Sequence, residues 1–243
     1  MKRMLILIAL LPAMVQAQSA DTAHAIIARF TTMLNHDGLP ADSMLVMETT
    51  VSYVDSRDTF VMRRWYTPPK MLRVEVWRGD TLTAGYCTNG TSRYRSYSTL
   101  DGWWKDTDST NFMRTVAAYD FRGPFLPNDT MGTHYTYAGT TTLKGMPLTV
   151  VRAERKEMYV RHYLFEQQSG LLLFIIEGDE LSKGSSGRLY GHSQWKAYHE
   201  YLPVGESLLP SEESYLRDGM VTIMRTRAHF EARNDKIFNQ DRL

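Results

Sequence analysis

Residues 65–90 read WYTPPKMLRVEVWRGDTLTAGYCTNG and decide how the rest of the chain is interpreted. Pro68-Pro69 excludes a helix at the start of this stretch, because proline fixes φ and lacks an N–H group. Two runs of strand type follow, one that ends at Gly79-Asp80 and one that ends at Asn89-Gly90, a pair typical of tight hairpins. In the first run, apolar residues alternate with polar ones: Leu72, Val74, Val76. The stretch therefore predicts an antiparallel meander whose sheet has one apolar face.

The first 17 residues have the three parts of a secretory signal peptide. Lys2-Arg3 is the charged region, residues 4–14 are apolar, and Val15-Gln16-Ala17 provides a cleavage site. We expect cleavage after Ala17 and export of residues 18–243 to the periplasm. No later apolar run reaches the ~18 residues that a membrane-spanning helix needs. The sequence thus predicts a soluble periplasmic protein without a transmembrane segment.

Charge and cysteine content narrow the class of protein. The chain has 28 basic and 27 acidic residues, and without Lys2 and Arg3 the mature chain has a net charge near −1. A chain without a basic excess is a poor nucleic-acid ligand, so we expect no nucleic-acid partner. The single cysteine, Cys87, cannot form an internal disulfide, and its position in an expected strand favours a buried apolar role.

The mature chain begins with one amphipathic helix over residues 21–34, in which four apolar residues recur at helical spacing: Ile26, Ile27, Phe30, Leu34. From residue 43 the period changes to two, which predicts a strand over 43–55 and a return strand over 60–66. A second, short helix is expected between residue 109 and Gly123.

The remaining sequence predicts further short strands separated by turn-forming residues, at 133–139, 148–154, 158–166, 171–177, 192–201, 212–217 and 220–230. No internal repeat or linker interrupts them. The fold class is therefore mainly β, with a single antiparallel sheet of about 11 strands, a few helices and one domain.

The sequence offers no recognisable catalytic or metal-binding pattern. Seven histidines are scattered without an HxH or HExxH arrangement, and there is no GxSxG, Walker A or GxGxxG motif. The loop Gly184-Ser185-Ser186-Gly187 has the wrong spacing for a nucleophile elbow. We therefore expect a protein that is not an enzyme and uses neither a cofactor nor a metal ion.

An excess of apolar residues is the more informative signal. Aromatic residues make up 12% of the chain, there are 14 methionines, and residues 171–176 have no polar face. Two interpretations fit this excess. The sheet is either covered by helices and crossing segments as an ordinary core, or it is curved around an apolar cavity that takes acyl chains.

Several short motifs stand out along the chain. They are W-x-x-x-P-x-x-x-R at residues 65–73, Thr88-Asn89-Gly90 followed by Tyr94 and Tyr97, residues 204–210 and residues 234–238. Together with the signal peptide, the N-terminal helix, the middle helix and the late run of strands, they resemble the LolA/LolB-like outer-membrane lipoprotein-sorting proteins of Bacteroidetes type. This resemblance implies a strongly curved sheet that forms an incomplete β-barrel, with helices as plug or lid.

The resemblance also implies a function and a set of residues. The family shields acyl chains of lipids and lipoproteins during transit, with transient contacts to the envelope lipoprotein machinery, and we expect a monomer. The concave face would bind the hydrophobic ligand through Leu45, Met47, Val51, Leu72, Val74 and Val76. Family members have a basic lid-latching residue just before the motif's proline, where this chain has Pro68, which leaves Arg63 or Arg64 as the latch.

Two other classes of function remain open at this stage. A carbohydrate-binding protein would use exposed aromatic side chains as stacking platforms: Tyr94, Tyr97, Trp103, Trp104. An envelope sensor of the anti-sigma-regulator type would bind lipid on the same fold and act through a protein partner.

Overall fold

The computed structural model describes residues 20–34, 40, 42–67, 71–90, 94–107, 125, 133–155, 159–178, 194–217 and 219–238. Three predicted segments lie outside the described residues. They are the signal peptide, the second helix before Gly123, and the loop at residues 184–187.

Thirteen β-strands occur among the described residues: β1 (Ser43–Tyr53), β2 (Thr59–Thr67), β3 (Met71–Arg78), β4 (Thr81–Thr88), β5 (Tyr94–Ser98), β6 (Trp104–Asp106), β7 (His134–Leu143), β8 (Met146–Arg155), β9 (Tyr159–Glu166), β10 (Leu172–Glu177), β11 (Gln194–Val204), β12 (Ser207–Arg217) and β13 (Met220–Ala232). They form one sheet in the order β6-β5-β4-β3-β2-β1-β13-β12-β11-β10-β9-β8-β7. Because β6 and β7 end this order, the sheet is open.

The prediction of a mainly β fold with a single antiparallel sheet is confirmed, with thirteen strands where about eleven were expected. Strand β6 is only three residues long, too short to show an alternating pattern. Strand β12 begins at Ser207, five residues before the predicted start at 212, and thus contains Pro210.

The chain divides into two compact units, and we describe each by itself. Unit 1 consists of Met1–Met33, Pro124–Tyr198 and Tyr215–Gly219, and unit 2 consists of Leu34–Gly123, His199–Ser214 and Met220–Leu243.

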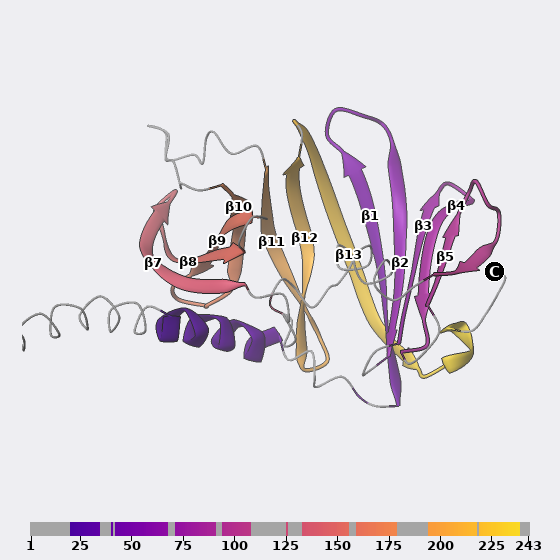
Figure 1. Cartoon of the computed structure of the whole chain (residues 1–243), viewed down its shortest axis with the longest axis horizontal. Helices are drawn as coiled ribbons and strands as arrows, with labels where there is room; N and C mark the ends of the chain where they lie inside the picture. Colours follow the sequence, from indigo (N-terminus) through magenta and orange to yellow (C-terminus); the bar gives the residue numbers. More distant parts are fainter. Residues whose placement is uncertain are drawn as a thin grey trace, which may run out of the picture. The chain divides into compact units, whose positions relative to one another are not determined.

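In unit 1 the N-terminal helix (residues 20–34) lies alongside the rolled strands β7–β10 (Figure 1). Phe30 is buried and places its ring edge-on against Phe125 and Phe165, with centroids 5.9 and 5.6 Å apart. Arg29 Nη2 donates a hydrogen bond to the carbonyl oxygen of Gln168, at 2.9 Å. The helix predicted from apolar spacing is thus present, and one aromatic cluster and one polar contact hold it. No helix among the described residues is long and apolar enough to cross a membrane.

The other sheet face of unit 1 has its own apolar cluster, made of Leu148, Val150, Leu164 and Ile176, all at most 2% exposed. The turn between β7 and β8 consists of Lys144 and Gly145. They have φ of 50° and 82°, the left-handed pair that a two-residue hairpin requires.

Unit 2 contains β1–β6, β13, parts of β11 and β12, and a short 3-10 helix, η3 (Asp235–Phe238). Both faces of its sheet carry a hydrophobic cluster. One cluster contains Leu45, Met47, Tyr66, Val204 and Leu209, and the other contains Met44, Cys87, Trp104 and Phe238. Since successive residues of β1 take part in different clusters, we name the first side face A and the second side face B.

Candidate functional site

The strand register places all six predicted ligand-binding residues on face A. Residues that pair directly across neighbouring strands have side chains on the same side of a sheet. Three such rows cross β1, β2 and β3: Leu45 with Tyr66 and Leu72, Met47 with Arg64 and Val74, and Thr49 with Met62 and Val76. Val51 pairs with Phe60 and extends the apolar area toward the β1–β2 turn.

Most of these side chains are already in contact with the rest of the chain. Leu45, Met47, Val51 and Val74 are at most 4% exposed, whereas Leu72 and Val76 are half-buried. Leu45 and Met47 pack with Val204 and Leu209 from the β11–β12 hairpin. An apolar ligand that bound here would therefore replace contacts that the side chains of this face make among themselves.

A row of buried polar groups crosses face A. Arg64, only 7% exposed, donates from Nη2 to Thr49 Oγ1 at 2.7 Å. Thr49 Oγ1 lies 2.8 Å from Thr226 Oγ1 on β13, and both hydroxyls are buried. Arg64 thus adds a cationic side chain to the apolar part of face A, near the middle of β2.

Arg63, the other expected latch residue, lies on face B. Its Nε is 3.0 Å from Glu48 Oε2, with both side chains about half exposed. Its guanidinium carbon is 5.8 Å from the centroid of the Trp77 ring. Of the two basic residues, only Arg64 is on the same face as the six predicted ligand-binding residues.

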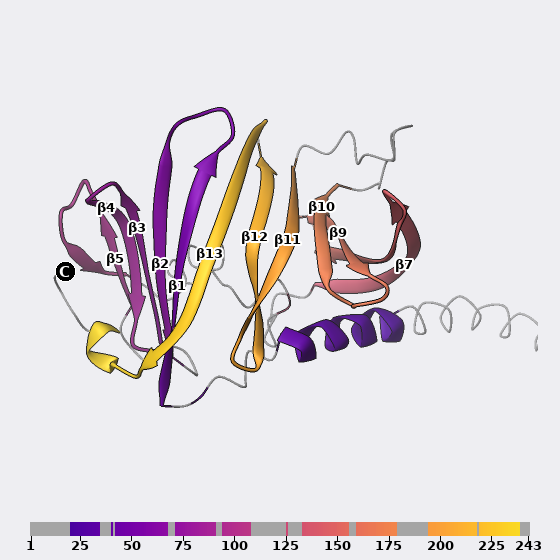
Figure 2. The same cartoon turned by 180° about the vertical axis from the view of Figure 1, so that it is seen from behind.

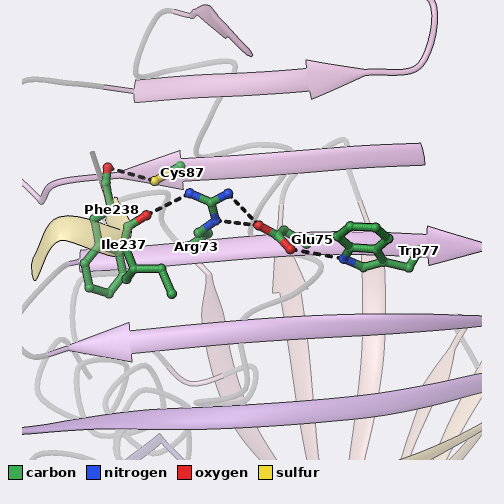
Figure 3. Close-up of polar contacts among 6 residues, drawn as sticks. All are labelled: Arg73, Glu75, Trp77, Cys87, Ile237 and Phe238. Carbon is green, nitrogen blue, oxygen red and sulfur yellow. Dashed lines mark hydrogen bonds and ion pairs between the residues drawn. The ribbon is translucent and has the colours of Figure 1, made fainter. Parts of the chain in front are cut away.

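Face B contains a buried ion pair that the sequence did not reveal. The polar residues that alternate with Leu72, Val74 and Val76 on β3 indicated a solvent-exposed face. Arg73 and Glu75, however, are each 1% exposed. Arg73 Nε and Nη2 both lie 2.6 Å from Glu75 Oε1, and Trp77 Nε1 donates to Glu75 Oε2 at 3.0 Å (Figure 3).

The C-terminal 3-10 helix covers this ion pair. Arg73 Nη1 donates to the carbonyl oxygen of Ile237 at 2.7 Å, and Cys87 Sγ donates to that of Phe238 at 3.0 Å (Figure 3). Phe238 is 1% exposed and Cys87 2%. The buried position expected for Cys87 is therefore present, with a hydrogen bond that an apolar residue would not make.

Trp104 lies over β4 on face B, and Gly85 makes room for it. The Arg73 guanidinium is 4.8 Å from the Trp104 ring centroid. A Cβ atom on Gly85 would lie 2.6 Å from Trp104 Cη2, closer than side chains approach. Glycine within a strand is typical of such a close approach.

Gly85→Ala should lower the free energy of unfolding by about 1–3 kcal/mol, because the Trp104 ring must move off its packed position. Urea unfolding followed by tryptophan fluorescence measures the change. Adding Trp104→Phe to the Gly85→Ala protein should restore part of the lost stability, since the smaller ring leaves space for the methyl group. Equal stability of wild type and Gly85→Ala would contradict this packing.

The four candidate stacking aromatics are not equivalent. Trp104 is 8% exposed and belongs to the core, Tyr94 and Tyr97 are half-buried, and Trp103 is 63% exposed. Within the described ranges, His, Cys, Asp and Glu side chains form no group of three that could hold a metal ion.

Comparison with known proteins shows similarity in structure only. No family model matches the chain, and no curated protein matches its sequence. A DUF1329 family protein from Desulfovibrio piger has a TM-score of 0.57 at 11% identity, over 90% of this chain and 97% of that one.

Two further solved structures share the architecture. A LolA superfamily protein from Nitrosomonas europaea has a TM-score of 0.54 at 12% identity, over 90% of this chain and 97% of that one. A putative outer membrane lipoprotein-sorting protein domain from Vibrio parahaemolyticus has a TM-score of 0.55 at 12% identity, over 92% and 97%. The Bacteroidetes subtype stays a prediction. At these identities the similarity establishes the architecture, and this chain has a LolA-like fold.

Proposed function

We propose that this protein is an exported, non-catalytic periplasmic carrier that binds lipid acyl chains on face A, and that its cargo is lipoproteins bound for the outer membrane. The observation that carries the proposal is the strand register, which brings all six predicted apolar residues to one face. The LolA-like fold supports it, because that fold also occurs in a putative lipoprotein-sorting domain.

The physical basis of binding is burial of hydrocarbon. Each methylene group of an acyl chain removed from water contributes about 0.8 kcal/mol, so an apolar face gives affinity without any chemical step. Met47 and Met62 on this face have flexible, unbranched side chains that adapt to ligands of different shape. Leu72 and Val76, which are half-buried, are the positions where a ligand would make first contact.

Arg64 provides a buried cationic side chain on face A. We propose that Arg64, and not Arg63, has the latch role expected of a basic residue in β2. The pairing of Arg63 with Glu48 on face B supports this assignment. The guanidinium of Arg64 is held by Thr49, whose hydroxyl is in turn held by Thr226.

Leu72→Glu should abolish bound lipid while the protein stays folded, because a half-buried carboxylate opposes an acyl chain and can still reach water. The measurement is native mass spectrometry of protein purified from its own cell envelope, followed by solvent extraction and lipid identification. Thr50→Glu is the matched control, since Thr50 is exposed and lies on the opposite face of β1.

The proposal requires lipid in the wild type and in Thr50→Glu and its loss in Leu72→Glu. Wild-type protein that is purified empty and also fails to take up a fluorescent fatty-acid probe would contradict it. Retention of lipid by Leu72→Glu would contradict the assignment of the ligand to face A.

A further inference from the structure

The most exposed large apolar side chains of the described residues lie in hairpin turns or directly beside one. Val54, Leu100, Trp103 and Met220 are 56%, 99%, 63% and 58% exposed. Val54 belongs to the β1–β2 turn, Met220 begins β13 after the β12–β13 turn, and the other two belong to the β5–β6 turn. We call these four residues the apolar rim.

The strand register places these turns at the same end of unit 2. Tyr53 pairs with Thr222, and Val54 N donates to the carbonyl oxygen of Val221, which joins the β1–β2 turn to the start of β13. Val61 pairs with Trp77 and Ala84 pairs with Ser98, which brings the β3–β4 and β5–β6 turns to the same end. Figure 2 shows the upper ends of β1–β5 and β13 along one edge of the unit.

The rim is broad. It extends over seven neighbouring strands, counted from β13 to β6. With about 4.8 Å between strands, the rim extends about 30 Å along the sheet. Such a row of separate projecting turns suits a partner that is itself an extended surface.

Three backbone amide groups of the β5–β6 turn make hydrogen bonds within the protein. The amide groups of Asp101 and Gly102 both donate to the carbonyl oxygen of Ser98, at 3.1 and 3.0 Å. Thr99 donates from both its amide and its hydroxyl to the carbonyl oxygen of Thr83, at 3.3 and 2.9 Å. A turn whose hydrogen bonds are made within the protein loses little when it leaves water.

Two ion pairs lie beside the rim. Asp101 accepts hydrogen bonds from Lys105 and Ser98, which hold the pKa of its carboxyl below the usual value, so this carboxyl stays ionised at neutral pH. Lys105 Nζ also lies 6.0 Å from the Trp103 ring centroid. Next to the β1–β2 turn, Arg78 Nη2 pairs with Asp58 at 2.9 Å.

We infer that the apolar rim docks on the surface of a phospholipid membrane, with Leu100 and Trp103 at the boundary between headgroups and acyl chains. Tryptophan favours that boundary because its ring is apolar and its N–H group is polar. The balanced ion pairs match a zwitterionic lipid surface, which carries no net charge. The inference stands on the exposed turns alone and does not require a ligand on face A.

Flotation with phosphatidylcholine vesicles tests this docking surface. The protein should begin at Gln18, because the apolar run of residues 4–14 would bind lipid by itself. Wild-type protein should float with the vesicles, and Leu100→Ser/Trp103→Ser should bind about tenfold more weakly or worse. Leu100→Met keeps an apolar side chain and should bind as the wild type does. Raising the salt concentration from about 0.1 M to about 1 M should leave binding nearly unchanged, since the two ion pairs beside the rim carry no net charge.

An environment-sensitive fluorophore gives a second readout. Attached to Leu100→Cys it should shift to the blue on addition of vesicles. Attached to Asn234→Cys, an exposed position next to η3 at the other end of β13, it should not. Wild-type protein that stays at the bottom of the gradient would overturn the inference, as would equal flotation of the Leu100→Ser/Trp103→Ser protein.

A polysaccharide partner would give a different pattern. Binding to isolated cell-wall sacculi that is lost in Trp103→Ala but kept in Leu100→Ser, without vesicle binding, would mean that Trp103 stacks on sugar and that the membrane inference is wrong. The rim variant also separates this inference from the carrier function. Leu100→Ser/Trp103→Ser should keep its bound lipid in native mass spectrometry, whereas Leu72→Glu should keep its vesicle binding.

Discussion

Glu75→Leu should lower the free energy of unfolding by about 3–5 kcal/mol. The substitution leaves the Arg73 guanidinium buried at 1% exposure without its carboxylate partner, and water cannot replace the lost contact. Trp77 Nε1 also loses its acceptor. Urea unfolding at neutral pH measures the loss as a lower midpoint with an unchanged slope.

Two further variants test whether the buried, unpaired charge of Arg73 causes the loss of stability. Glu48→Leu removes the partner of Arg63 in a half-exposed ion pair and should cost less than about 1 kcal/mol. Arg73→Leu in the Glu75→Leu protein should restore part of the stability, because no unpaired charge remains. Equal losses in Glu75→Leu and Glu48→Leu would contradict the role assigned to burial.

The same substitution should loosen the C-terminal 3-10 helix. Arg73 bonds the carbonyl oxygen of Ile237, and the neighbouring carbonyl of Phe238 is bonded by the buried thiol of Cys87. If Arg73 shifts, Cys87 should react faster with a thiol reagent under native conditions. The rate in Glu48→Leu should match that of the wild type.

The periodicity of the sequence predicts which side chains share a face of a strand or a helix. Alternation in β1 and β3 identifies the side chains of face A, and the register confirms that Leu45 and Leu72 share that face. The helix over residues 20–34 follows from the spacing of Phe30 and Leu34. Alternation also places Arg63 and Arg64 on opposite faces, because adjacent residues of a strand point to opposite sides of the sheet. Which of the two faces binds ligand does not follow from the alternation.

The burial of Arg73 and Glu75 could not be predicted in this way. Their alternation with apolar residues is typical of a strand with one solvated side. They are buried because η3 covers them, and Ile237 is 164 positions away from Arg73 in the sequence. Gly85 was the only local sign that something lies close above face B, since glycine is unfavourable in a strand without such a reason.

Phe30→Ala should destabilise unit 1 by about 3–5 kcal/mol. The ring is 2% exposed and fills the space between the helix and the aromatic side chains of Phe125 and Phe165. A helix of this length is marginal in water by itself, so its stability comes from the packing of its apolar side. Hydrogen exchange of residues 20–34 should therefore become much faster, and the amides of β1–β4 should keep their protection.

Arg29→Ala is the matched control on the same helix. The bond from Arg29 to the Gln168 carbonyl is exposed, so its removal should cost about 1 kcal/mol and leave exchange in the helix nearly unchanged. The pair of variants also tests the expected lid role of the helix. If the helix retains an acyl ligand, Phe30→Ala should release a bound fatty-acid probe faster than Arg29→Ala does. Hydrogen exchange shows whether the helix is loosened in Phe30→Ala. If it is loosened and the two release rates are still equal, the helix does not contribute to the barrier to release. Retention would then depend on the face A side chains and on Arg64.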